Sequence, residues 1–145
     1  MKLSHPSHSQ GQSLVEFSLL LWAFLLLAVV TFDLGRGIYY YSVVHNSARE
    51  GARYGIINPD DTEGIISNAE RLSIGLNQDQ LSVVSCECGN IANECIGEMA
   101  CEVGEKDIIK VQVTYNFQLV TPLVEQVLGR DEFELQSISK MYIER

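Results

Sequence analysis

The strongest hydrophobic pattern of this chain lies near its N-terminus. Residues 13–32 read SLVEFSLLLWAFLLLAVVTF, and Glu16 is the only charged residue among them. Twenty residues of α-helix extend ~30 Å, which is the thickness of the hydrocarbon core of a bilayer. The apolar residues surround the helix instead of forming one stripe, which disfavours the core helix of a soluble domain. The run is also too long for the apolar region of a cleaved signal peptide, and no small-x-small cleavage site follows it. We therefore expect a transmembrane helix at residues 12–33.

The helix is expected to continue beyond the membrane as a stalk at residues 34–57. No strong helix breaker occurs before Pro59, although Gly35 and Gly37 would permit a bend. Small residues that let another backbone approach closely recur in this stalk at spacings of three and four. They are Ser47, Ala48, Gly51, Ala52 and Gly55. Since an amphipathic helix most often covers its own core, we expect this face to pack on the sheet of the same chain in preference to another subunit.

A strict alternation of apolar and polar residues over residues 109–119 predicts a β-strand with one buried and one solvated face. The apolar positions are Ile109, Val111, Val113, Tyr115, Phe117 and Leu119. Lys110 has the opposite parity and is expected to face water. A sheet with one solvated face is usually antiparallel, with helices over its apolar face.

Shorter segments around this strand predict the rest of the distal region. A turn at residues 58–62 leads into a helix, and strands and a short helix follow. We place these elements at residues 62–76 (helix), 81–86 (strand), 121–129 (helix, opened by Thr121-Pro122 and closed by Gly129) and 133–143 (strand). On the last strand Ser137 and Ser139 share the parity of the apolar residues. Either these serines accommodate the stalk helix closely, or Ile138 marks a bulge.

The expected fold class is α+β. A long N-terminal transmembrane and stalk helix packs on a small antiparallel sheet of three to four strands, and residues 58–145 form the head. The negative charge of the chain lies in the head. The whole chain has a net charge of −9, and residues 57–145 hold 16 acidic and 6 basic residues. An acidic head argues against nucleic acid as a partner, since phosphates are bound by clustered Lys and Arg. A hydrophobic content of 46% argues against disorder.

All four cysteines fall within a polar stretch of sixteen residues. They are Cys86, Cys88, Cys95 and Cys101. An even number of cysteines outside the cytoplasm favours two disulfides. Four zinc-bound thiolates are the other interpretation, but the spacing lacks the paired C-x2–4-C knuckles of most structural zinc sites. Of the three possible disulfide pairings we prefer the nested one, Cys86–Cys101 with Cys88–Cys95, which would staple a hairpin.

No motif for catalysis is found in the sequence. It contains no nucleophile–base pair, phosphate loop, paired-His metal motif or D-x-D-x-D-G calcium loop. The only histidine beyond the first ten residues is His45, on a polar face of the stalk, where a solvated side chain is expected. Arg49, Glu50 and Arg53 are expected to form a solvated ion-pair patch. We therefore expect neither an enzyme nor a bound cofactor or metal.

Two motifs resemble a known family. Gly11, four residues and then Glu16-Phe17 precede the apolar run, as in the processing site of type IV prepilins. Together with NSAREGARY at residues 46–54, this segment resembles the TadE-like family, which are pseudopilins of the tight-adherence (Tad or Flp) pilus. The resemblance covers residues 11–55 closely and the remainder only in its general, pilin-like pattern.

The resemblance implies processing and assembly. Residues 1–11 would be a leader removed after Gly11 by a membrane-embedded aspartyl prepilin peptidase, which leaves Gln12 as the mature N-terminus. The mature chain would act in pilus assembly and adhesion as a minor pilin or pseudopilin. Its partners would be other pilins and pseudopilins, the peptidase and the membrane platform of the assembly machinery.

Glu16 has two interpretations. A carboxylate within an apolar span costs a few kcal/mol unless it stays shallow or finds a partner. It either reaches headgroup water, or it pairs with the new Gln12 amine of a neighbouring subunit. Such a pair would fix the register between subunits, since its loss leaves a buried lone charge.

The charge distribution and the family resemblance predict opposite orientations of the helix in the membrane. Lys2 precedes the span and Arg36, Arg49 and Arg53 follow it, so the positive-inside tendency favours an external N-terminus. The family topology instead places the N-terminus in the cytoplasm and the head outside the cytoplasmic (inner) membrane. We expect the family topology, because Asp33 offsets Arg36 and the cysteines suit an oxidising compartment.

The sequence therefore predicts a membrane-anchored pseudopilin that is cut after Gly11. The alternative is an uncleaved single-pass anchor that displays a ligand-binding or adhesive domain. A zinc-binding accessory domain is a third possibility.

Overall fold

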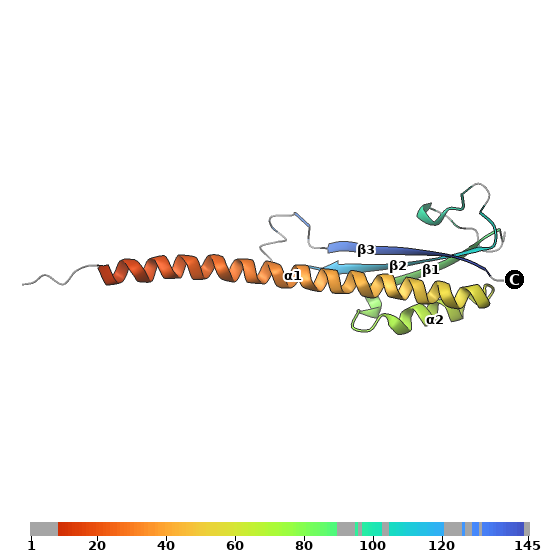
Figure 1. Ribbon diagram of the computed structural model, residues 1–145, viewed down its shortest axis with the longest axis horizontal. Helices are drawn as coiled ribbons and strands as arrows, with labels where there is room; N and C mark the ends of the chain where they lie inside the picture. The colour runs from red at the N-terminus through yellow and green to blue at the C-terminus, as the bar shows by residue number, and fades with distance from the viewer. Residues whose placement is uncertain are drawn as a thin grey trace, which may run out of the picture.

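A computed structural model describes residues 9–89, 95, 97–102, 105–120, 126, 129–130 and 132–143 (Figure 1). One long helix, α1 (Ser9–Ile57), extends from the N-terminal side into the head. The head adds helix α2 (Thr62–Leu72) and strands β1 (Leu81–Cys88), β2 (Ile108–Gln118) and β3 (Glu132–Tyr142). Short 3-10 turns occur at η1 (Gln78–Gln80) and η3 (Gly97–Met99). The predicted α+β class is confirmed.

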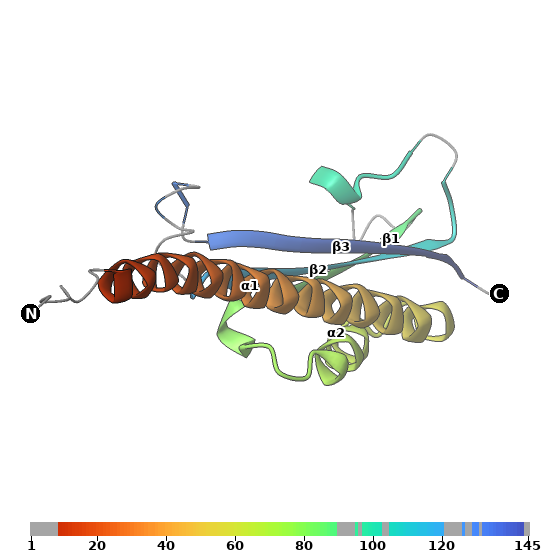
Figure 2. The same ribbon diagram turned by 60° about the vertical axis from the view of Figure 1, so that its left-hand side comes forward.

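The sheet is a three-stranded antiparallel meander in the order β1-β2-β3. The C-terminal half of α1 lies along β3 and β2, and α2 lies beside α1 (Figures 1 and 2). The N-terminal half of α1 extends away from the head (Figure 1). The helix is not interrupted at Gly35 or Gly37, so the predicted transmembrane and stalk segments form one continuous helix.

The predicted element boundaries need small corrections. The helix expected to reach Leu76 ends at Leu72, because the Ser73 N–H and hydroxyl both donate to the Glu70 carbonyl oxygen and close the last turn. The first strand runs two residues further than predicted, to Cys88, and the second begins and ends one residue earlier. Most of the short helix predicted at residues 121–129 lies outside the described residues.

The strand β3 has no bulge. Its register with β2 is continuous, with Ser137 opposite Val113 and Ser139 opposite Val111. Both serines are buried on the face that α1 covers, so of the two alternatives the close approach of the stalk helix is correct.

The main core lies between the helices and this inner face of the sheet. Apolar side chains from α1, α2 and β2 form it, in keeping with the predicted alternation. Its fully buried members are Val44, Ala48, Ala52, Ile65, Ala69, Ile109, Val111 and Val113. A second, smaller core lies on the outer face, where Cys86, Cys88, Cys95, Met99 and Ile108 are buried together.

The outer face is therefore not uniformly solvated, and the prediction for Lys110 was wrong. This side chain is fully buried, because the segment around η3 folds back over the distal part of the sheet and covers it. The remaining polar residues of β2 on this face are half-buried or exposed.

Candidate functional site

The predicted processing segment lies in the exposed N-terminal part of α1. Gln12, Glu16 and Phe17 are all exposed, and no atom lies within 4 Å of the position that a Cβ at Gly11 would take. Among the described residues the Glu16 carboxylate has no hydrogen-bond or ion-pair partner. Within the described part of the chain, this acid is thus left to solvent or membrane.

The apolar stretch that follows is equally uncovered. Leu14, Leu19, Trp22 and Phe24 are each about two-thirds exposed, and at about 100° per residue they lie on different sides of the helix. Within the described part of the chain, α1 is the one helix long and apolar enough to cross a membrane, and its most apolar window is not buried in the head at all. This helix therefore fits a single-pass membrane anchor. We call the exposed part, residues 13–32, the apolar rod.

The small-residue face of α1 lies against the head. A Cβ at Gly51 would lie 3.1 Å from the Ala69 Cβ and 3.1 Å from the Val111 Cγ1, and one at Gly55 only 2.9 Å from the Ile109 Cγ1. Ser47, Ala48 and Ala52, the other small residues of the predicted face, are fully buried. Glycine at these two positions lets α1 approach α2 and β2 more closely than any side chain would.

Polar contacts fix the edges of this helix packing. The His45 Nδ1 lies 3.0 Å from the Ser137 Oγ on β3, so His45 is not merely solvated. The Tyr54 hydroxyl donates to Asp61, the residue that caps α2 and accepts the Gly64 N–H.

The basic and acidic residues of the stalk form a different pair from the one expected. Glu50 lies 3.9 Å from Arg71 on α2. Arg49 and Arg53 are exposed and make no ion pair among the described residues.

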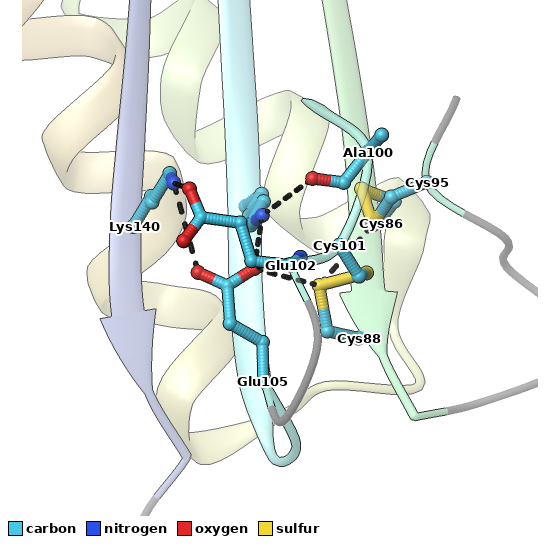
Figure 3. The surroundings of a disulfide bond; sticks show 9 residues. Cys86, Cys88, Cys95, Ala100, Cys101, Glu102, Glu105 and Lys140 are labelled. Atoms are coloured by element: carbon cyan, nitrogen blue, oxygen red, sulfur yellow. Dashed lines mark hydrogen bonds and ion pairs between the residues drawn. A yellow bond between two sulfur atoms is a disulfide. The ribbon is translucent and has the colours of Figure 1, made fainter. Parts of the chain in front are cut away.

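The four cysteines form two disulfides, as predicted, but their pairing is different. Cys86 is bonded to Cys95, and Cys88 to Cys101 (Figure 3). The nested pairing assumed a hairpin. Instead, Cys86 and Cys88 point to the same face of β1, because they are two residues apart on a strand, and the chain crosses back over that face. Cys95, the first cysteine of the returning segment, therefore bonds to Cys86, and Cys101, the second, bonds to Cys88.

A partly buried ion pair adjoins the disulfides on the outer face (Figure 3). The Lys110 ammonium donates to the Glu105 carboxylate at 2.5 Å and to the Ala100 carbonyl oxygen at 3.0 Å. The hydrogen bond from Lys110, with a second from the Glu102 N–H, lowers the pKa of the Glu105 carboxyl from its ordinary 4.5 to about 2. Glu105 also lies 3.6 Å from Lys140. It thus offsets the positive charges of two neighbouring lysines on adjacent strands.

This arrangement leaves no thiolate for the zinc interpretation. The sulfur atoms of Cys88, Cys95 and Cys101 lie within 4.8 Å of one another, but every cysteine is in a disulfide. A zinc site needs deprotonated thiols, which oxidised sulfur does not provide.

Sequence reasoning missed two features of the head. It placed Lys110 in water, although two apolar neighbours on β2 and nearby cysteines on β1 were a signal that a covering loop was available. It also missed a groove between α1 and the sheet, because residues at the near ends of β2 and β3, far from α1 in the sequence, form one of its walls.

The comparisons with known proteins address the N-terminal region. No curated protein and no solved structure matches the chain. The family model described as "TadE-like protein" matches residues 11–53. This match begins at the predicted processing site, includes the apolar rod and ends on the small-residue face. The predicted resemblance is thus confirmed: over residues 11–53, this chain is similar to the TadE-like family.

Proposed function

We propose that this chain is a pseudopilin of a Tad-type pilus, anchored by the apolar rod, processed after Gly11 and incorporated into or beside the pilus. One observation carries the proposal. A single continuous helix, similar to the TadE-like family over residues 11–53, packs its second half against a folded head, while its first half presents apolar side chains on every side. Such a rod cannot remain in water, because apolar surface on all sides requires lipid or other apolar helices.

The position of Glu16 supports assembly through the rod. Its carboxylate has no partner within the described residues and lies close to the Gln12 nitrogen that cleavage would free. Four residues of helix separate the two by ~6 Å along the axis. A small axial shift between parallel rods therefore suffices to bring the amine of one subunit to the acid of another. Pairing would then select one register.

The disulfides support a head outside the cytoplasm. Structural disulfides persist in oxidising compartments and are rare in the cytosol. With the head outside, a single span places the N-terminus, and hence the cleavage site, on the cytoplasmic side of the inner membrane. The head is then free to contact other minor subunits, and the partners that we propose are pilins, the prepilin peptidase and the assembly platform.

Mass determination of the N-terminus tests the processing step. In pilus-producing cells, the membrane-extracted chain should begin at Gln12, and Gly11→Leu should leave the leader attached. An intact Met1 in the wild-type chain would overturn the proposal in favour of the uncleaved anchor with a ligand-binding or adhesive head.

A second variant separates assembly from processing. Glu16→Ala should leave the cleaved N-terminus in place and reduce recovery of the chain in sheared pili, by about tenfold or more if the acid sets the register. Glu63→Ala, on the exposed side of α2, is the matched control and should leave recovery unchanged. Equal recovery of the two variants would contradict the role of Glu16.

A further inference from the structure

An apolar groove lies where α1 leaves the rod and meets the near end of the sheet. Its volume is about 430 Å³, within the ~300–1,000 Å³ range of small-molecule sites. One wall is α1, with Val30, Leu34 and Ile38, and the other is the end of the sheet, with Phe117, Leu119 and Phe133. Leu34 and Ile38 are 64% and 68% exposed, so the α1 wall is open to an occupant.

The one charged residue of the lining is already compensated. Asp33 is 6% exposed and lies 3.7 Å from Arg36, one turn further along the helix. The Arg36 guanidinium in turn lies 5.6 Å from the Tyr40 ring centroid and 5.5 Å from that of Phe117. The groove therefore presents an apolar interior without an unmatched charge.

The position of the groove along α1 indicates which layer of the membrane it faces. Val30 belongs to the rod, two residues before its end, whereas Tyr41, the most distant α1 residue of the lining, lies nine residues beyond it. At ~1.5 Å per residue, the groove extends from ~3 Å inside the rod to ~14 Å outside it. The headgroup layer is ~5–8 Å thick on each side of the hydrocarbon core. With the rod spanning the membrane, the groove thus opens at the hydrocarbon boundary and crosses the headgroup layer.

Aromatic residues mark the same depth. Tyr39 and Tyr41 are about half exposed, at 53% and 51%. Tyrosine side chains of this kind are enriched where a membrane meets water, since the ring is apolar and the hydroxyl polar. Arg36, whose side chain is 40% exposed, lies ~6 Å beyond the end of the rod, which is the height of the lipid phosphates if the rod spans the membrane.

We propose that the groove holds an acyl chain of a bilayer phospholipid, so that the near end of the sheet is embedded in the membrane interface. The groove is continuous with the lipid-covered surface of the rod, and its apolar lining offers no unmatched charge for a polar partner to pair with. The proposal rests on membrane insertion of α1 and is independent of cleavage after Gly11.

Fluorescence quenching by lipids brominated on their acyl chains tests this proposal. Trp22, the single tryptophan, lies in the rod and reports insertion of the full-length chain into phosphatidylcholine vesicles. In a Trp22→Phe background, the Leu119→Trp variant should be quenched at least half as strongly as Trp22 in the wild type. The Ile38→Trp variant, at an exposed position that does not endanger folding, should behave in the same way. Ile57→Trp, at the far end of α1 and 77% exposed, is the control and should not be quenched.

A groove-filling variant distinguishes entry of a lipid from mere proximity to the membrane. A Cβ at Gly37, which lines the groove, would have only Phe117 near it, at 4.0 Å, so there is room to begin a side chain there and Gly37→Leu should fill part of the groove. Added to the Leu119→Trp variant, it should reduce the quenching of the introduced indole at least twofold. Added to the wild type, it should leave the quenching of Trp22 unchanged.

Three outcomes would overturn the proposal. Quenching of Trp22 without quenching in the Leu119→Trp and Ile38→Trp variants would show an inserted rod and an empty groove. Quenching in the Leu119→Trp variant that decreases as the protein-to-lipid ratio rises would show that a second copy of the chain occupies the groove. An unquenched Trp22 would refute membrane insertion itself, and with it the function proposed above, whereas failure of cleavage alone would leave this inference standing.

Discussion

The two faces of the sheet are covered by different means. The inner face is covered by α1 and α2, through a core of apolar residues that small residues on α1 bring into close contact. The outer face is covered at its distal end by a loop that two disulfides and the Lys110–Glu105 pair hold in place. An apolar core is stabilised by the apolar surface that it removes from water, whereas a polar loop buries too little apolar surface to stay folded by itself. Disulfide bonds therefore hold the covering segment on the outer face, whereas apolar packing holds the helices on the inner face.

The largest loss of stability should come from removing the disulfides that hold the loop on the outer face. Replacing Cys88 and Cys101 by serine should lower the free energy of unfolding by about 2–4 kcal/mol, since a disulfide limits the entropy of the unfolded chain. Replacing Cys86 and Cys95 by serine should lower the free energy of unfolding by less. The Cys86–Cys95 disulfide closes the shorter loop, with a sequence separation of 9 against 13. Denaturant titration of the detergent-solubilised chain, followed by near-ultraviolet circular dichroism, measures both. Non-reducing peptide mapping should recover Cys86–Cys95 and Cys88–Cys101, and a nested pair would contradict the arrangement described here.

Overpacking should destabilise the contact between α1 and the inner face of the sheet. Gly51→Leu would place a side chain against Ala69, Val111 and the Ile65 carbonyl oxygen, and we expect a loss of about 1–3 kcal/mol. Gly37→Leu is the same substitution on the same helix where space is open. It should be neutral or stabilise by up to ~1 kcal/mol, because leucine favours helix more than glycine. Equal effects at the two positions in the same denaturant titration would argue against close packing at Gly51.

The smallest effect should be the contribution of Glu105, and pH reveals it. The folded-state pKa of about 2 lies below the ordinary 4.5, so the stabilisation is fully present above pH 4.5 and is lost as the pH falls through 2. Glu105→Gln should therefore be less stable than wild type at about pH 6, and the two denaturation midpoints should converge near pH 2. Glu102→Gln removes a carboxylate that is 78% exposed and should parallel wild type at every pH. A constant difference between Glu105→Gln and wild type over this range would exclude the ion pair as the cause.

The same division explains what the sequence could predict. The inner face follows from periodicity, so the rod, the small-residue face and the alternation over β2 were recognisable from residue order alone. The outer face depends on where a polar loop crosses the sheet, which no periodic signal records. Hence the disulfides were predicted but their pairing was not, and Lys110 was assigned to solvent. The groove was missed for a related reason: Leu119 and Phe133 meet α1 only after β2 and β3 are paired in register.

The unbroken course of α1 has a mechanical consequence. A continuous helix of 49 residues is a stiff lever ~73 Å long, to which the head is attached along one side. Any twist applied to the membrane end is therefore passed to the far end, and the head must swing around the helix axis by the same angle. Which surface of the head points outward is decided by how its lever is rotated among its neighbours.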